Sequence, residues 1–238
     1  MLFRTLREQV VAANLELVSQ GLVLYTFGNA SGISRADAVV AIKPSGVPYS
    51  ELTPDRIVLT DLDGKVIDSN LRPSSDLPTH LALYRHFPSI GGVAHTHSEQ
   101  ATAWAQAQRP IPCLGTTHAD YFHGPVPVTA PLDADAIARD YEKETGSAIC
   151  RTFAHLDPDA VPAVLVAGHG PFTWGADPAA AAHHAVVLEY VARMATTTLA
   201  INADARPLER SLHDKHFFRK HGPTAYYGQI TGLRASNQ

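Results

Sequence analysis

Three histidines stand where the sequence could build a catalytic metal site. His95 and His97 end the apolar stretch GGVAHTH, and His169 follows a second apolar stretch, between two glycines. Residues i and i+2 of a strand point to the same face, so the imidazoles of His95 and His97 should converge. Three nitrogen ligands leave one position of a tetrahedral zinc ion open, which is typical of catalytic zinc. The pattern therefore predicts a catalytic metal site. The alternative for the HxH pair is two hydrogen-bonded polar side chains at a strand end.

Further segments combine residues that could bind an anion such as phosphate. In RPSSDLPTH two serines and Asp76 open a predicted helix, and hydroxyls beside free backbone N–H groups suit an anion, although helix capping is the alternative. FGNASG and IKPSG add glycines, an amide, a cation and a hydroxyl, or form ordinary turns. The candidate anion-binding residues are Gly28, Asn29, Lys43, Ser45, Gly46, Ser74 and Ser75.

Two segments in the second half of the chain could carry protons. Asp120 lies in the proline-rich middle, in GTTHADYF, where an acid could transfer a proton or form a turn. Tyr226 and Tyr227 lie close to the C-terminus, which is unusual unless something buries or uses them.

Composition narrows the class of protein. The 238 residues are 45% hydrophobic and 18% charged, which excludes wholesale disorder. The net charge of −4 lacks a basic block, so neither nucleic acid nor an anionic membrane is an expected partner. Two cysteines without CxxC spacing contrast with 13 histidines, so metal chemistry should rest on imidazole. The charged N-terminus is unlike a signal peptide, and no window of eighteen apolar residues occurs, so we expect a cytoplasmic protein.

These residues are held by a predicted alternation of helices and strands. Tight turns join several strands, which favours a three-layer α/β/α sandwich with a mixed, largely antiparallel sheet over a doubly wound fold. We expect a single domain over residues 1–229 and a tail of unassigned role over 230–238. Helices are expected at residues 2–20, 77–87, 98–107, 132–144, 178–201 and 212–220. Strands are expected at residues 22–26, 39–42, 56–60, 65–68, 91–96 and 161–167.

Taken together, the segments resemble the L-ribulose-5-phosphate 4-epimerases of the class II, metal-dependent aldolase superfamily. Nine strings match in order from about Leu2 to Gln229, so the resemblance covers almost the whole chain. The strings are GNASG, IKPSGV, RPSSDLPTH, FPSIGG-x-AHTHS, GTTHADYF, YEKETG, GHGPF-x-WG, DKHFFRKHG and AYYGQ, where x is a position that does not contribute to the match.

The resemblance implies a role for each matched position. His95, His97 and His169 match the family's metal ligands, and Asp76 matches its acidic residue beside the metal, where fuculose-phosphate-type aldolases carry glutamate. The anion-binding candidates match its phosphate-contacting residues. Asp120 and Tyr227 match its two proton carriers, and His216 and Arg219 match residues that reach the site from a neighbouring subunit. A cyclic homotetramer with active sites at subunit interfaces is also implied.

The resemblance implies a zinc-dependent epimerase, with Mn²⁺ or Co²⁺ as possible substitutes. It would interconvert L-ribulose 5-phosphate and D-xylulose 5-phosphate by retro-aldol cleavage and re-addition at C3–C4, as in arabinose or ascorbate degradation. The alternative of the same superfamily is a sugar-phosphate aldolase of the fuculose-phosphate type. A non-catalytic scaffold would need no proton carriers, and a zincin-type metallohydrolase is disfavoured because HExxH is absent.

Overall fold

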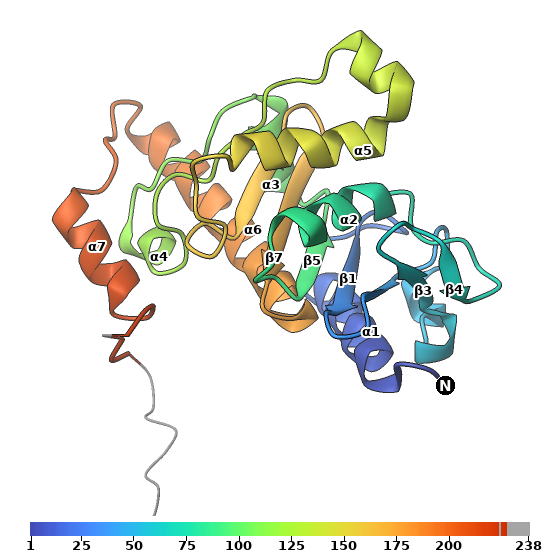
Figure 1. Cartoon of the computed structure of the whole chain (residues 1–238). Coiled ribbons are helices and arrows are strands. Elements are labelled where there is room, and N and C mark those ends of the chain that lie inside the picture. Colours follow the sequence, from blue (N-terminus) through green and yellow to red (C-terminus); the bar gives the residue numbers. More distant parts are fainter. Residues whose placement is uncertain (224, 228–238) are drawn as a thin grey trace, which may run out of the picture.

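A seven-stranded sheet forms the centre of the molecule (Figure 1). The computed structural model describes residues 1–223 and 225–227. The strands lie side by side in the order β4-β3-β2-β1-β5-β7-β6, and every neighbouring pair is antiparallel. Their bounds are β1 (Asn29–Ser34), β2 (Val39–Ile42), β3 (Val58–Asp61), β4 (Val66–Asp68), β5 (Gly92–His95), β6 (Ala163–Val166) and β7 (Gly170–Gly175). The expected largely antiparallel sheet is confirmed, and parallel pairing in the described residues is limited to one isolated bridge, Val128–Leu165.

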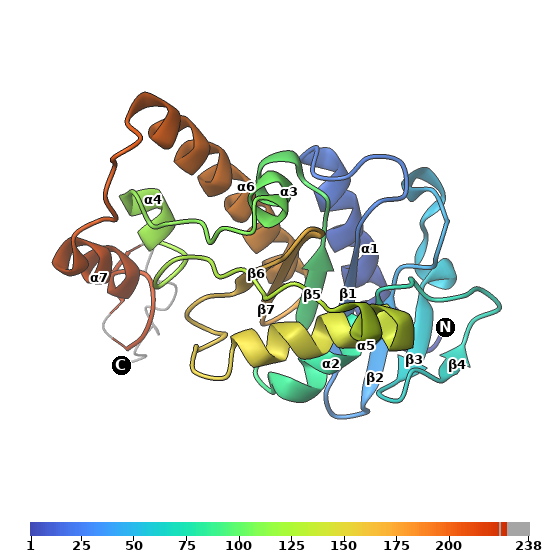
Figure 2. The ribbon, with the colours of Figure 1, turned by 90° about the horizontal axis from the view of Figure 1, so that it is seen from above.

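Helices cover both faces of the sheet, which confirms the three-layer sandwich (Figure 2). On one face lie α1 (Arg4–Ser19), α3 (Glu99–Gln106) and α6 (Pro178–Ile201). On the other lie α2 (Leu77–His86) and α5 (Ala134–Thr152). The short helix α4 (Thr116–Ala119) packs against α7 (Arg210–Phe218) beyond the β6 edge of the sheet. Two 3₁₀ turns, Tyr49–Glu51 and Pro54–Arg56, lie between β2 and β3.

The packing of α6 against the sheet depends on small residues. The helix presents buried Ala181, Ala182 and Ala185. At Gly92 on β5, an added Cβ would lie 2.3 Å from the carbonyl oxygen of Asp177, the residue that caps α6. A larger side chain there would therefore push α6 off the end of the strand that carries His95. No helix within the described residues is long and apolar enough to cross a membrane.

Two sequence predictions about elements were wrong. Residues 22–26 are not a strand; the strand is β1, which begins at Asn29 inside the segment expected to be a turn. The turn is made at Gly28, whose φ of +82° suits a glycine. The strand β1 that follows pairs with β2 on one side and with β5 on the other. The helix expected at residues 132–144 does not end before Gly146, because α5 continues through this glycine to Thr152. Gly146 lets α5 approach α2, since an added Cβ would lie 2.6 Å from the Cβ of Ala82.

His80 and His118 are among the histidines that this fold buries outside the predicted metal site. His80 on α2 exchanges a 2.7 Å hydrogen bond with the Ser31 hydroxyl, and His118 contacts the Gly124 carbonyl oxygen at 2.8 Å. Burial lowers the pKa of His80 to about 3 and that of His118 to about 4. Both rings are therefore neutral in the folded chain under conditions where the unfolded chain protonates them.

This burial predicts that acid destabilises the metal-free protein. Well above pH 6.5 neither state is protonated at these rings, so they add no pH dependence there. As the pH falls from about 6 towards 4, the unfolded state takes up protons and the folded state does not. The free energy of unfolding should then fall by about 1.4 kcal/mol per pH unit for each ring. Urea unfolding at stepped pH measures this, and His118→Gln should give a shallower slope. A flat profile between pH 6.5 and 4.5 would contradict it.

Candidate functional site

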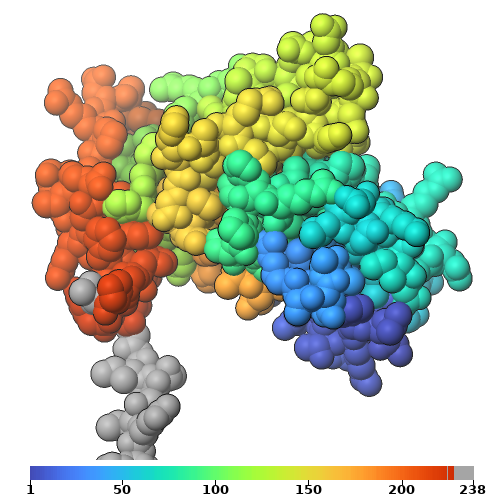
Figure 3. Space-filling view, in the orientation of Figure 1, coloured from blue at the N-terminus to red at the C-terminus, as the bar shows by residue number. Residues whose placement is uncertain are grey.

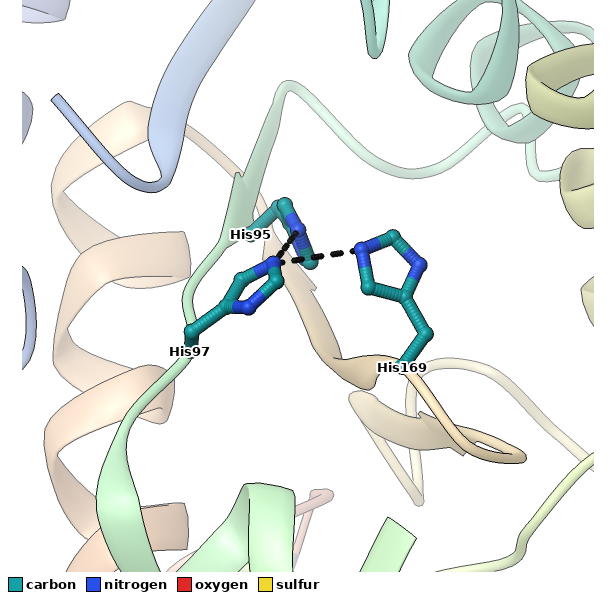
Figure 4. Close-up of side chains that lie close together, drawn as sticks. All are labelled: His95, His97 and His169. Atoms are coloured by element: carbon teal, nitrogen blue, oxygen red, sulfur yellow. Dashed lines mark hydrogen bonds between the residues drawn. The ribbon is translucent and has the colours of Figure 1, made fainter. Parts of the chain in front are cut away.

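The three predicted ligand histidines meet at one point of the structure (Figure 4). His95 is the last residue of β5, His97 follows two residues later, and His169 lies in the turn between β6 and β7. Because β5 pairs with β7, the end of β5 lies beside that turn. The Nε2 atom of His97 lies 3.1 Å from Nε2 of His95 and 3.2 Å from Nε2 of His169. Three aromatic nitrogens therefore converge from three points along the chain.

The second nitrogens of two of these rings are engaged elsewhere, which fits a metal centre. His95 Nδ1 lies 2.9 Å from the carbonyl oxygen of Pro171, which can only accept a hydrogen bond. His169 Nδ1 lies 3.1 Å from the hydroxyl of Tyr141. A ligating histidine usually donates its outer N–H to such a partner and keeps the lone pair on the other nitrogen for the metal. The residues present therefore fit a divalent cation bound through Nε2.

The charge state of these side chains also suits a divalent cation. Burial, followed by the neighbouring imidazoles, lowers the pKa of His169 to about 4, so this ring is neutral near pH 7. Asp76 is buried enough to raise its pKa, but nearby His95, His80 and a hydrogen bond from Asn29 bring the net pKa below its ordinary value. A carboxylate therefore lies close to the three imidazoles, a donor set that zinc accepts.

The cluster of His95, His97 and His169 opens onto a cavity of about 410 Å³. All the candidate anion-binding residues and predicted metal ligands line it: Gly28, Asn29, Lys43, Ser45, Gly46, Ser74, Ser75, Asp76, His95, His97 and His169. A larger hollow of about 770 Å³, between α2 and α5, contains none of them. The cavity at the end of β5 is therefore the candidate active site.

Two loops of the cavity are joined by their backbones. The amide of Ser74 donates to the carbonyl of Lys43 at 3.0 Å, and the amide of Ser45 donates to the carbonyl of Arg72 at 3.0 Å. The side-chain amide of Asn29, at the start of β1, donates to the Ser74 hydroxyl at 3.1 Å. These bonds place the hydroxyls, the amide and the ammonium of the predicted anion site around one volume.

Lys43 lacks an anionic partner within the described part of the chain. Its side chain is only 2% exposed, and its Nζ contacts the Pro44 carbonyl at 3.4 Å and the face of the Tyr49 ring at 4.7 Å. Burial lowers the pKa of Lys43, as expected for an ammonium without a counter-ion. The buried side-chain oxygen of Asn29, Oδ1, likewise has no hydrogen-bond partner among the described residues. Both groups would be satisfied by a phosphorylated, hydroxylated ligand.

The four remaining predicted residues gather at a different place. Asp120, at the end of α4, contacts His216 Nδ1 at 3.0 Å, Arg219 Nη2 at 2.8 Å and Lys220 Nζ at 3.2 Å. Burial would raise the pKa of Asp120, but the hydrogen bonds from Arg219, His216 and Lys220 bring the net pKa below its ordinary value. The Tyr227 ring lies 4.8 Å from the Arg219 guanidinium carbon.

This α4–α7 cluster, made of Asp120, His216, Arg219, Lys220 and Tyr227, shares no residue with the lining of the cavity. The helix α7 forms one flank of the molecule, and the N-terminal segments form the opposite one (Figure 3). A single chain therefore unites the predicted metal and phosphate residues with one another, but not with the predicted proton carriers.

A second group of possible metal donors lies in the same flank. His123, His213 and Asp214 have donor atoms within 4.8 Å of one another. However, the two rings stack in parallel with centroids 4.9 Å apart, and Asp214 already accepts from His123 and from Arg210, each at 2.8 Å. Stacked rings cannot both direct lone pairs at one ion, so this group joins α7 to the α4 loop by hydrogen bonds.

Sequence reasoning missed Tyr141 and Glu142, which also line the cavity. Both lie inside the string YEKETG, yet the pattern assigned them only to a helix. The available signal was Asp140, a good helix N-cap in the middle of a helical pattern. Phe27, half exposed, is a further aromatic at the cavity, and its ring lies 6.2 Å from that of His97.

Comparisons with known proteins agree with this geometry. Residues 8–196 match the family described as the class II aldolase and adducin N-terminal domain. The L-ribulose-5-phosphate 4-epimerase UlaF of Salmonella paratyphi A is 52% identical over 224 residues, 94% of this chain and 98% of the relative. The protein of that name from Salmonella typhi matches equally well.

Solved structures share the fold. An L-fuculose 1-phosphate aldolase superposes with a TM-score of 0.79 at 23% identity, covering 91% of this chain and 96% of that one. YgbL of Klebsiella pneumoniae superposes with a TM-score of 0.72 at 28% identity, covering 90% and 99%. The chain therefore belongs to the class II aldolase family of enzymes and, within it, to the group of the L-ribulose-5-phosphate 4-epimerases.

Proposed function

We propose that this protein is a zinc-dependent epimerase that interconverts L-ribulose 5-phosphate and D-xylulose 5-phosphate. The observation that carries the proposal is one cavity holding three convergent imidazole Nε2 atoms together with a buried lysine ammonium that has no anionic partner among the described residues. Relatives that carry this name are 52% identical over 94% of the chain, which supports the choice of substrate. Manganese or cobalt could replace zinc, because imidazole accepts all three.

The metal would be held by His95, His97 and His169, with Asp76 beside it. When bound, it would supply Lewis-acid stabilisation of negative charge that develops on the substrate oxygens at C2 and C3. The hydrogen bonds at the outer nitrogens of His95 and His169 keep these two rings in the tautomer that binds through Nε2.

The phosphate cradle, formed by Asn29, Lys43 and Ser74 with the glycines and serines around them, has a kinetic task. Retro-aldol cleavage of C3–C4 gives an enediolate and glycolaldehyde phosphate. The aldehyde must stay bound by its phosphate while its carbonyl rotates and presents the opposite face. Re-formation of the bond then gives the inverted centre at C4. A cradle that released the aldehyde would leave an aldolase.

Asp120 and Tyr227 are the proposed proton carriers on opposite sides of C4. Cleavage removes the proton of the C4 hydroxyl, and re-addition to the other face returns a proton to the new C4 oxygen. Since neither residue lines the cavity of its own chain, we propose that a neighbouring subunit supplies them, with His216 and Arg219. This requires an oligomer with active sites at its subunit interfaces, and we propose the homotetramer that the family resemblance implies, built from a single domain of residues 1–229. The phosphate group of a sugar phosphate is charged, so such a substrate does not readily cross a bilayer and is found where it is made. This supports a cytoplasmic location for the enzyme.

Chelation tests the metal requirement directly. Dialysis against a chelator should abolish conversion of L-ribulose 5-phosphate, and zinc should restore it. Full activity in protein that has been proved metal-free by elemental analysis would contradict the proposal.

The cradle makes a separate prediction. Lys43→Met removes the buried ammonium, and the loss of a charged hydrogen bond should raise KM roughly 10- to 100-fold. It should also release detectable glycolaldehyde phosphate, because the intermediate is held less tightly. Lys65→Met, an exposed lysine of the β3–β4 turn, is the matched control and should behave as wild type. An unchanged KM in Lys43→Met would show that the phosphate binds elsewhere.

A further inference from the structure

Helix α5 is interrupted where it passes the candidate site. Asp140 has φ −170° and ψ 85°, which is extended backbone inside a helix of 19 residues. Its carboxylate accepts a hydrogen bond from the backbone N–H of Lys143 at 3.3 Å, and the Thr145 hydroxyl donates to the Tyr141 carbonyl at 2.8 Å. Asp140 therefore acts as the N-cap of a second helical segment. The interruption is encoded locally, and Tyr141 is the first residue after it.

The interruption brings Tyr141 into the cavity. Its hydroxyl lies 3.1 Å from His169 Nδ1, while His169 Nε2 lies 3.2 Å from His97 Nε2. A ring whose Nε2 binds a cation carries its proton on Nδ1, and the phenol oxygen can accept that proton's hydrogen bond. The two nitrogens of His169 are thus divided between the phenol and the convergence point.

His169 depends on this contact more than His95 does. His95 is 2% exposed, bonds to the backbone carbonyl of Pro171, and stacks on the Phe172 ring with centroids 4.2 Å apart. His169 is only partly buried and lies in a turn between two glycines, the first with a φ of +72°. Its nearest aromatic neighbour besides the histidines is Tyr141, at 5.9 Å. Backbone and packing therefore hold the His169 ring weakly, and the phenol is its one hydrogen-bond partner outside the histidine cluster among the described residues.

We propose that Tyr141 is a positioning residue for the metal ligand His169, fixing both the orientation of the ring and its Nδ1–H tautomer. The inference deepens the proposed function and rests on it in one respect, that His169 is a metal ligand. It also gives the break at Asp140 a purpose, since an uninterrupted helix would direct residue 141 differently.

Cobalt binding tests this role without any assay of activity. The dissociation constant for Co²⁺ should be measured by competition with a chromophoric chelator, together with the visible absorption of the bound cobalt. Tyr141→Phe should weaken binding roughly 10- to 100-fold and shift the cobalt bands, because a ligand with a disordered ring changes the ligand field. Tyr190→Phe, an exposed tyrosine of α6, is the matched control and should leave both unchanged.

A double-mutant cycle separates positioning from a general structural effect. In a His169→Ala background, Tyr141→Phe should cause no further loss of cobalt affinity, because its effect runs through the missing ring. An equal loss in both backgrounds would overturn the proposal, as would wild-type affinity and spectrum in Tyr141→Phe. If the wild type binds cobalt but converts no pentulose phosphate, the proposed function fails and this inference stands.

Discussion

Replacing His97 by alanine should abolish tight zinc binding and lower epimerase activity about a thousandfold or more. The Nε2 atom of His97 lies within 3.2 Å of those of His95 and His169, so its loss removes the atom that joins the other two. A Lewis acid contributes several kcal/mol of transition-state stabilisation, and each 1.36 kcal/mol is tenfold in rate. Zinc content by elemental analysis and kcat/KM for L-ribulose 5-phosphate are the measurements.

His155→Ala is the matched control for this variant. His155 is exposed and belongs to neither histidine cluster, so zinc content and rate should match the wild type. A His97→Ala protein that is folded, free of zinc and still active would show that the reaction does not require the metal. Retention of stoichiometric zinc would instead show that the ion binds at other residues.

Asp120→Asn should lower kcat by about 10²- to 10⁴-fold, the usual contribution of a positioned proton carrier. The amide keeps the shape and can still contact α7, but it cannot accept the proton of a C4 hydroxyl. Zinc content should be unchanged, because Asp120 does not line the metal-type cavity. The measurements are kcat in both directions and the zinc content of the same sample.

Asp214→Asn distinguishes proton transfer from simple attachment of α7. Asp214 also fixes α7, through His123 and Arg210, but is outside the proposed machinery. A similar loss in both variants would mean that Asp120 serves only to hold the helix. If subunits share sites, mixing inactive Asp120→Asn and His97→Ala chains and refolding them together should restore part of the activity. Mixtures that stay inactive would argue for sites contained within one chain.

The sequence was most informative where local chemistry and strand ends coincide. The HxH pair at the end of an apolar strand and a glycine-flanked histidine at the end of another predicted a convergence that the structure contains, because both strands end at the same edge. The long alanine-rich helix was predicted with its observed bounds, Pro178–Ile201, since Pro at the first position and a continuous periodic pattern define it.

Features set by tertiary pairing were harder to predict. GNASG has the composition of a turn, yet Asn29 begins a central strand, since pairing with β2 and β5 outweighs local propensity. Glycine often ends a helix, yet Gly146 lies inside α5 and allows the close approach of α2. The contact between Tyr141 and His169 joins residues 28 positions apart and depends on a helix break, so no periodicity could indicate it. The separation of Asp120 from the cavity likewise reflects a spatial arrangement that motif order does not contain.

The proposed epimerase must cleave and re-form the C3–C4 bond of a pentulose phosphate without releasing the fragments. The most direct measurement is a product assay on zinc-loaded protein with L-ribulose 5-phosphate, which quantifies D-xylulose 5-phosphate and free glycolaldehyde phosphate in the same sample. D-xylulose 5-phosphate should be the main product, with only traces of the aldehyde. Glycolaldehyde phosphate as the main product, or no turnover by fully zinc-loaded protein, would contradict the proposal.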